Sequence, residues 1–107
     1  MAPRMTTSVL KVVAALLADP AAERYGLQLM QTTGLPSGTL YPILVRLERA
    51  GWVESRWERT DPVADGRPNR RYYQLTAEGA VAARREVTAM QQQMAQVAAP
   101  GAKVRPA

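Results

Sequence analysis

The sequence predicts a mainly α-helical fold with a small β-hairpin. Three segments before residue 50 repeat apolar side chains at three- and four-residue spacing, which is typical of amphipathic helices. Two short runs that resemble strands follow, on either side of a Pro- and Gly-containing segment at 60–69. A long helical segment then covers 77–98. Three helices followed by a hairpin describe a winged helix-turn-helix, here extended by a long C-terminal helix.

The composition excludes several kinds of chemistry. The 107 residues include no His and no Cys, so the chain has no imidazole general base, no Cys-His nucleophile and no thiolate or imidazole zinc site. We therefore expect no enzyme activity, no cofactor and no metal. No stretch approaches the ~20 apolar residues of a membrane span, and the N-terminus does not resemble a signal peptide. A cytoplasmic protein with no membrane partner is expected.

The charge suits a polyanionic partner or simple solubility. The formal net charge is +5, from 14 Lys and Arg against 9 Asp and Glu. The basic residues are spread along the chain rather than gathered in one block. Any surface for nucleic acid must therefore depend on where individual arginines point.

The first two helices have recognisable starts and stops. Ser8 is a suitable N-cap for a helix that ends before Asp19-Pro20, because a residue that precedes proline is pushed out of the helical region. A second helix is expected over 25–33, with Gly34 as the glycine that ends it. Its candidate core side chains are Leu27, Leu29 and Met30.

The third helix is the most informative segment. Ser37 is a natural N-cap, the helix runs to Ala50, and Gly51 ends it. One face collects four apolar side chains, Leu40, Ile43, Leu44 and Leu47. Pro42 breaks a local rule, since proline inside a helix removes one backbone hydrogen bond. This proline either answers a functional demand or makes a harmless kink.

The hairpin is expected to form a wing. Strands over 52–58 and 70–75 flank a loop over 60–69, and the tip holds three arginines without an acid. Such a tip can reach the DNA backbone or the minor groove. Arg71 has the same strand parity as Tyr73 and Leu75, so it is expected to face the sheet side with them if they face the core. Tyr72, Trp52 and Trp57 are interpreted as hairpin or core aromatic residues.

The last helix predicts pairing with a second copy of the chain. Thr76 is its expected cap, and an apolar seam recurs along it at Ala80, Ala83, Val87, Met90, Met94 and Val97. A domain this small cannot cover so long a seam, although a helix folded wholly onto its own domain is the alternative. The predicted organisation is a disordered tail over 1–7, a winged helix-turn-helix DNA-binding domain over 8–76, a dimerisation helix over 77–99 and a disordered tail over 100–107.

Over roughly residues 8–90 the chain also resembles the PadR-like transcriptional regulators. The resemblance rests on Tyr25-Gly26-Leu27, Gly34-Leu35-Pro36-Ser37-Gly38-Thr39-Leu40-Tyr41-Pro42-Ile43-Leu44, Arg46-Leu47-Glu48, Gly51-Trp52-Val53, Gly66-Arg67-Pro68-Asn69-Arg70-Arg71-Tyr72-Tyr73 and Leu75-Thr76-Ala77-Glu78-Gly79. It implies a homodimer, usually a repressor, that binds double-stranded DNA at an inverted-repeat operator near its own gene or a neighbouring one. The chain is similar to the short class, in which a single last helix forms the dimer.

A small-molecule effector is a further expectation from this resemblance. Some short relatives bind planar aromatic compounds between subunits through aromatic residues on the last helix. Here that helix carries Met90 and Met94 but no Phe, Trp or Tyr.

The candidate sites follow from the expected phases of the helices and strands. Predicted DNA contacts are Ser37, Gly38, Thr39, Tyr41, Pro42, Arg46, Arg49, Arg67, Asn69, Arg70 and Arg71. Predicted dimer contacts are Ala83, Val87, Met90, Met94 and Val97. Tyr41 has an alternative role as a packing tyrosine under the wing. Two other functions stay open: a winged-helix module that docks a protein partner and binds DNA only incidentally, and a small-molecule-binding protein without a genetic role.

Overall fold

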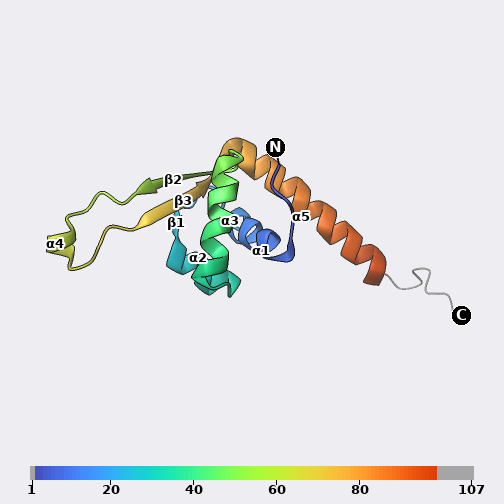
Figure 1. Cartoon of the computed structure of the whole chain (residues 1–107). Helices are drawn as coiled ribbons and strands as arrows, with labels where there is room; N and C mark the ends of the chain where they lie inside the picture. The colour runs from blue at the N-terminus through green and yellow to red at the C-terminus, as the bar shows by residue number, and fades with distance from the viewer. Residues whose placement is uncertain (1, 99–107) are drawn as a thin grey trace, which may run out of the picture.

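Eight elements follow one another along residues 2–98, the part of the chain that the computed structural model describes (Figure 1). The predicted mainly helical winged fold with a long last helix is confirmed. The elements are α1 (Thr7–Leu17), β1 (Arg24–Tyr25), α2 (Gly26–Thr33), α3 (Ser37–Arg49), β2 (Val53–Trp57), α4 (Pro62–Asp65), β3 (Arg71–Leu75) and α5 (Ala77–Ala98).

The sheet has three strands rather than the two of the expected hairpin. Its order is β1-β3-β2, and all pairs are antiparallel. In the hairpin Val53 lies opposite Leu75 and Trp57 opposite Arg71, while β1 places Tyr25 opposite Tyr72. β1 is only two residues long, so it offers no alternation that a sequence pattern could reveal. It joins the start of α2 to the base of the wing.

One core connects α1, α3, the sheet and α5. The four apolar residues of α3 are all buried, as the helical spacing predicts. They meet a group from α1, the sheet and the turn before β2 that includes Val12, Val13, Leu16, Trp52, Tyr73 and Leu75. Full burial of one such side chain is worth about 1.5–3 kcal/mol. The stripe therefore fixes how α3 is rotated about its axis.

Two predicted N-caps are wrong. Thr6, not Ser8, caps α1, because its Oγ1 accepts a hydrogen bond of 3.2 Å from the Val9 backbone N–H. At α3 the N-cap position belongs to Pro36, whose carbonyl accepts from the N–H groups of Thr39 and Leu40. Ser37 is thus already the first helical residue. Gly34 does end α2, with a φ of 75° that favours glycine.

Two further expectations need correction. Leu27 is not a core residue, since it is 55% exposed while Leu29 is fully buried. Residues two apart on a helix point about 200° away from each other, so these two leucines cannot share one face. The loop over 60–69 contains one helical turn, α4, whose N-cap Asp61 accepts from the Val63 N–H at 3.0 Å.

The proline inside α3 lies on the exposed side of the helix. Pro42 supplies no N–H to the carbonyl of Gly38, one turn earlier, and Gly38 is itself exposed, where water can serve that carbonyl. One turn later, Arg46 Nε donates a hydrogen bond of 3.3 Å to the Pro42 carbonyl. The core face of α3 is therefore undisturbed by the proline.

The predicted start of α5 at Ala77 is confirmed, the helix continues to Ala98, the last described residue, and its seam divides into two parts. Thr76 Oγ1 caps the helix by accepting from the Gly79 N–H at 2.9 Å. Ala83 is fully buried, and Ala80 and Val87 pack partly buried against the core. Farther along, Met90 is half-buried, whereas Met94 and Val97 are 64% and 82% exposed. Figure 1 shows this distal half of α5 leaving the body of the domain.

Part of the expected N-terminal tail belongs to the folded domain. Of the expected N-terminal tail, Met5 packs partly buried against the core and Thr7 already begins α1. Met1, Ala99 and the expected tail over 100–107 lie outside the described residues. Within residues 2–98 no helix is long and apolar enough to cross a membrane.

The close contact between Gly79 of α5 and the backbone of Trp52, just before β2, predicts an effect on stability. A Cβ at Gly79 would lie 1.9 Å from the Trp52 carbonyl oxygen, which also accepts from the Thr76 N–H at 2.9 Å. Gly79→Ala should therefore lower the free energy of unfolding in urea by about 1–3 kcal/mol. Gly38→Ala is the matched control, because a Cβ there meets nothing within 4 Å. It should raise stability by up to about 1 kcal/mol. Equal effects of the two substitutions would contradict the close packing at Gly79.

Candidate nucleic-acid interface

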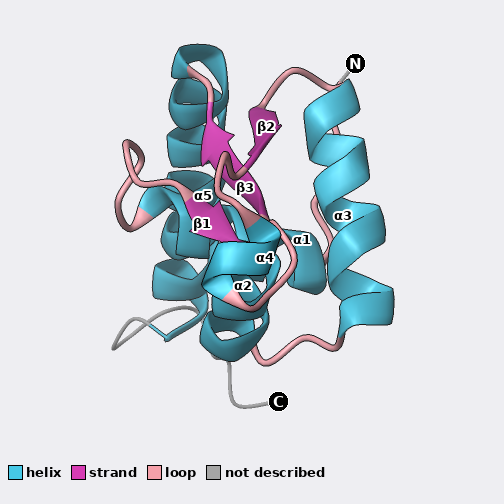
Figure 2. Cartoon of the chain, turned by 90° about the vertical axis from the view of Figure 1, so that its left-hand side faces the viewer, coloured by secondary structure: helices cyan, strands magenta, loops and turns pink. Residues whose placement is uncertain are grey.

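The outward face of α3 carries small, polar and cationic residues. Because the apolar stripe is buried, the opposite face of the helix must point outward. Figure 2 shows α3 running along one side of the molecule, next to β2. The exposed residues on it are Ser37, Gly38, Tyr41, Pro42, Val45, Arg46 and Arg49, with Thr39 half-buried. The structure thus brings together all predicted DNA contacts of this helix, and it adds Val45.

Tyr41 is both exposed and packed. The residue is 41% exposed, yet a Cβ at Gly26 would lie 2.0 Å from its hydroxyl oxygen. Its ring therefore packs on the backbone at the start of α2. This contact is possible only because residue 26 has no side chain, and it makes Tyr41 a link between α2 and α3.

The two arginines of α3 are available for an anion. Arg46 and Arg49 are exposed, and neither forms an ion pair within residues 2–98. They lie in the last turn of the helix. The N-terminal turn, by contrast, offers backbone N–H groups and the hydroxyl of Ser37, which suit phosphate oxygens.

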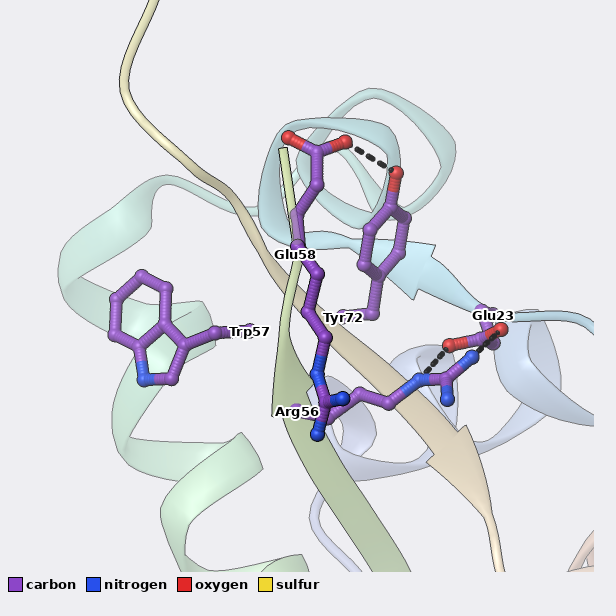
Figure 3. A pocket seen from close by; sticks show the side chains of 6 residues that line it. Glu23, Arg56, Trp57, Glu58 and Tyr72 are labelled. Atoms are coloured by element: carbon purple, nitrogen blue, oxygen red, sulfur yellow. Dashed lines mark hydrogen bonds and ion pairs between the residues drawn. The ribbon is translucent and has the colours of Figure 1, made fainter. Parts of the chain in front are cut away.

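The wing arginines have internal partners. Glu58, whose side chain is only 9% exposed, accepts hydrogen bonds from Arg67 at 2.6 and 3.2 Å and from Arg70 at 3.3 Å. The Tyr72 hydroxyl donates to the same carboxylate at 3.0 Å (Figure 3). We call these four residues the Glu58 cluster. The pKa of Glu58 is lowered to about 2, mainly by the hydrogen bond from Arg67, while partial burial opposes the shift.

The Glu58 cluster also touches the start of α2. The guanidinium of Arg70 lies 4.0 Å from the centre of the Tyr25 ring, and the rings of Tyr25 and Tyr72 meet edge to face at 5.7 Å. The Nε of Arg70 is buried without a hydrogen-bond partner in the structure. Near the tip, Asn69 accepts from the Thr60 hydroxyl at 2.6 Å and joins the two arms of the wing.

Arg71 faces α3, as its strand parity indicates. It donates to Ser55 Oγ at 2.7 and 3.1 Å, and it lies 3.7 Å from Glu48 of α3. Its guanidinium is 5.3 Å from the centre of the Trp57 ring. Trp57 is 59% exposed, and Figure 3 shows it on the opposite side of β2 from Arg56. An exposed aromatic ring and a cation therefore lie together on the wing, and the cation also approaches α3.

A hollow of about 660 Å³ beside β2 is less informative. Its lining includes Glu23, Arg56 and Tyr72. Glu23 and Arg56 already form an ion pair, which is the main cause that lowers the pKa of Glu23 (Figure 3). Within residues 2–98 no group of three or more acidic side chains could hold a metal ion. Because Glu23 and Arg56 are paired with each other, neither charge is available to a ligand in the hollow.

Comparison with known proteins decides the family. The transcriptional regulator PadR-like family matches residues 15–85. The chain belongs to this family. Comparison of the sequence with curated proteins gives no match.

Solved structures resemble the PadR-like chain over most of its length. A PadR-like transcription factor from Bacteroides fragilis is 23% identical, with a TM-score of 0.68 over 85% of this chain and 86% of its own. A PadR family transcriptional regulator from Eggerthella lenta is 24% identical, with a TM-score of 0.67 over 92% and 88%. The PcaV transcriptional regulator from Streptomyces coelicolor is 27% identical, with a TM-score of 0.65 over 86% and 61%. The first two likenesses show a shared fold.

Sequence reasoning missed Glu58 in this PadR-like chain, although a signal was present. The paired register places Val53 opposite Leu75, and its continuation brings Glu58 next to Arg70, whose carbonyl accepts from the Glu58 N–H at 2.7 Å. The expected strand ends, 58 and 70, therefore already imply this neighbourhood. The approach of Arg67 had no such signal, because it depends on how the chain turns after α4.

The Glu58 cluster predicts a pH-dependent stability. The pKa of Glu58 falls from 4.5 to about 2 on folding, so its stabilising effect is complete above pH 4.5 and is lost as the pH falls toward 2. Glu58→Gln should therefore lower Tm at pH 7, and the difference from the unsubstituted chain should shrink on acidification. Glu54→Gln is the control: Glu54 lies exposed on β2, the strand that ends just before Glu58 in the chain, and forms no ion pair within residues 2–98. A Tm difference for Glu58→Gln that is constant with pH would refute this assignment.

Proposed function

We propose that this PadR-like chain is a sequence-specific DNA-binding transcriptional regulator, and that it works as a homodimer in the cytoplasm. It represses its own or a neighbouring operon by binding an inverted-repeat operator. The observation that carries the proposal is the outward face of α3. Its first turn carries hydroxyl and backbone groups, and its last turn carries two arginines that form no ion pair within residues 2–98.

The dimensions of α3 support its entry into DNA. The major groove is about 12 Å wide and admits one α-helix. The first turn offers Ser37, Gly38 and Thr39, whose small size lets the backbone approach a phosphate or a base edge. Arg46 and Arg49 can then reach phosphates from the last turn, while Arg67, Asn69, Arg70 and Arg71 approach from the wing.

The distal half of α5 supports dimerisation. Met94 and Val97 are exposed although they continue a seam whose first residues are buried. A second copy of the helix would cover them, with Met90 and Val87 at the edge of the contact. Ala83 is fully buried within its own chain, so it acts by supporting the seam rather than by touching the partner. The α3 helices of the two copies would then read half-sites about 34 Å apart.

An effector is the remaining part of the proposal. PcaV, a fold neighbour, has also been solved in complex with its natural ligand. By analogy, a small molecule that favours a dimer with the wrong spacing between the two α3 helices would release the operator.

The proposal predicts salt-resistant binding to the fragment upstream of the chain's own gene. In gel shifts at about 50 and 200 mM salt, the native fragment should stay bound at the higher salt while a scrambled fragment is lost, because only phosphate contacts support the latter. Arg46→Ala should weaken binding to the native fragment by about 1–3 kcal/mol if the side chain reads a base, and lower the salt slope by about 1 if it contacts phosphate. Arg84→Ala, which removes an exposed arginine of α5, is the control and should change neither. Equal loss of both fragments at the higher salt would favour the alternative, a winged-helix module for a protein partner.

The dimer predicts a separate result in sedimentation. Met94→Glu places like charges in the seam of both copies and should shift the mass from two chains to one. Gln92→Glu introduces the same charge about 200° around the helix and should leave the dimer intact. A dimer that survives Met94→Glu would exclude this seam as the interface.

A further inference from the structure

Two arginines near the tip of the wing share one acidic partner. The carboxylate of Glu58 accepts hydrogen bonds from Arg67 and Arg70, and it accepts a further one from the Tyr72 hydroxyl. The third arginine, Arg71, approaches Glu48 of α3 at 3.7 Å. Each of the three arginines predicted to contact DNA from the wing therefore has an acidic partner within its own chain.

We propose that Glu58 is a specificity-determining residue, which competes with DNA phosphate for Arg67 and Arg70 and so lowers the affinity of the wing for DNA of any sequence. This inference rests on the proposed DNA-binding function. It assigns to an acidic residue a role in DNA recognition that the arginines at the tip of the wing, over 66–71, do not suggest.

Exposure favours competition over a permanent lock. The side chains of Arg67 and Arg70 remain 38% and 35% exposed, whereas that of Glu58 is 9% exposed. The guanidinium groups can thus turn toward a phosphate without unfolding of the wing, while the carboxylate stays behind. Because Arg67 holds the pKa of Glu58 far below neutrality, the competing charge is present at any pH near 7.

The competition acts unequally on specific and non-specific binding. Non-specific binding consists almost entirely of phosphate contacts, whereas the operator complex also has base contacts. A residue that weakens wing-to-phosphate contacts therefore removes a larger share of the non-specific affinity. Glu58 would increase the ratio of the affinity for the operator to the affinity for random DNA, although it lowers both affinities.

The test uses the full chain, a scrambled duplex and the native upstream fragment, with affinity measured across a salt series. Glu58→Gln should bind the scrambled duplex more tightly than Glu54→Gln does, with a salt slope steeper by about 0.9 for each arginine that gains a phosphate. Both substitutions remove one negative charge, so the comparison cancels the change in net charge. Equal slopes for the two variants would overturn the proposal.

A second substitution keeps the test decisive if Glu58→Gln fails to fold, which its melting curve would reveal. Arg67→Ala alone should change the slope on scrambled DNA by clearly less than 0.9, because Glu58 already occupies this arginine. A full loss of about 0.9 in the otherwise unchanged chain would overturn the proposal, since Arg67 would then be free.

Elution from heparin separates this inference from the proposed function. If the unsubstituted chain fails to distinguish native from scrambled DNA, the proposed function fails. The proposal for Glu58 is then tested by the salt concentration at which each variant elutes from heparin. Glu58→Gln should elute at higher salt than Glu54→Gln, and elution of both at the same salt would reject the proposal.

Discussion

The buried stripe of α3 is the constraint on which the rest of the structure depends. Four apolar side chains, spaced for one helical face, lie in the core with α1 and the sheet, and the cost of exposing any of them fixes the rotation of the helix. As a consequence of that burial, the residues of the candidate interface on α3 are exposed, apart from the half-buried Thr39. Tyr41 shows how close this arrangement is, because its hydroxyl fits only against a glycine at position 26. Core packing, rather than a flexible loop, therefore determines which face of α3 is available to DNA.

The wing is held by polar contacts rather than by a core of its own. At its base, Tyr25 pairs with Tyr72 in the sheet and carries the Arg70 guanidinium on its ring. On the other side, Arg71 and Ser55 connect it to Glu48 of α3. The wing thus keeps a defined position relative to α3 through charges that a DNA phosphate would compete for. The arginines proposed to contact DNA are the same ones that hold the wing in place, which is the basis of the influence on specificity proposed for Glu58.

Periodic, long elements could be predicted from the sequence, and short or long-range features could not. The residues of α5 have a clear cap at Thr76 and a sustained apolar repeat, so its expected start at Ala77 agrees with the structure. The two-residue β1 exists only through its pairing with β3, and the turn α4 depends on a local Asp-Pro start. The prediction of Leu27 as a core residue is wrong because this side chain points about 200° away from the buried Leu29. Of the predicted DNA contacts, those on α3 share one exposed face, since a single periodicity governs them. The wing arginines depend on partners many residues away, and no pattern along the chain encodes the approach of Arg67 to Glu58.

The most direct measurement of the central claim is a hydroxyl-radical footprint of the chain on the fragment upstream of its own gene. If α3 enters the major groove from each half of a dimer joined through α5, two protected regions should appear with centres about one helical turn, or 34 Å, apart and related by an inverted repeat. The wing should add protection at the flank of each region. A single protected region, or uniform protection that shifts with fragment length, would contradict the account, because the exposed face of α3 would then not be reading two half-sites.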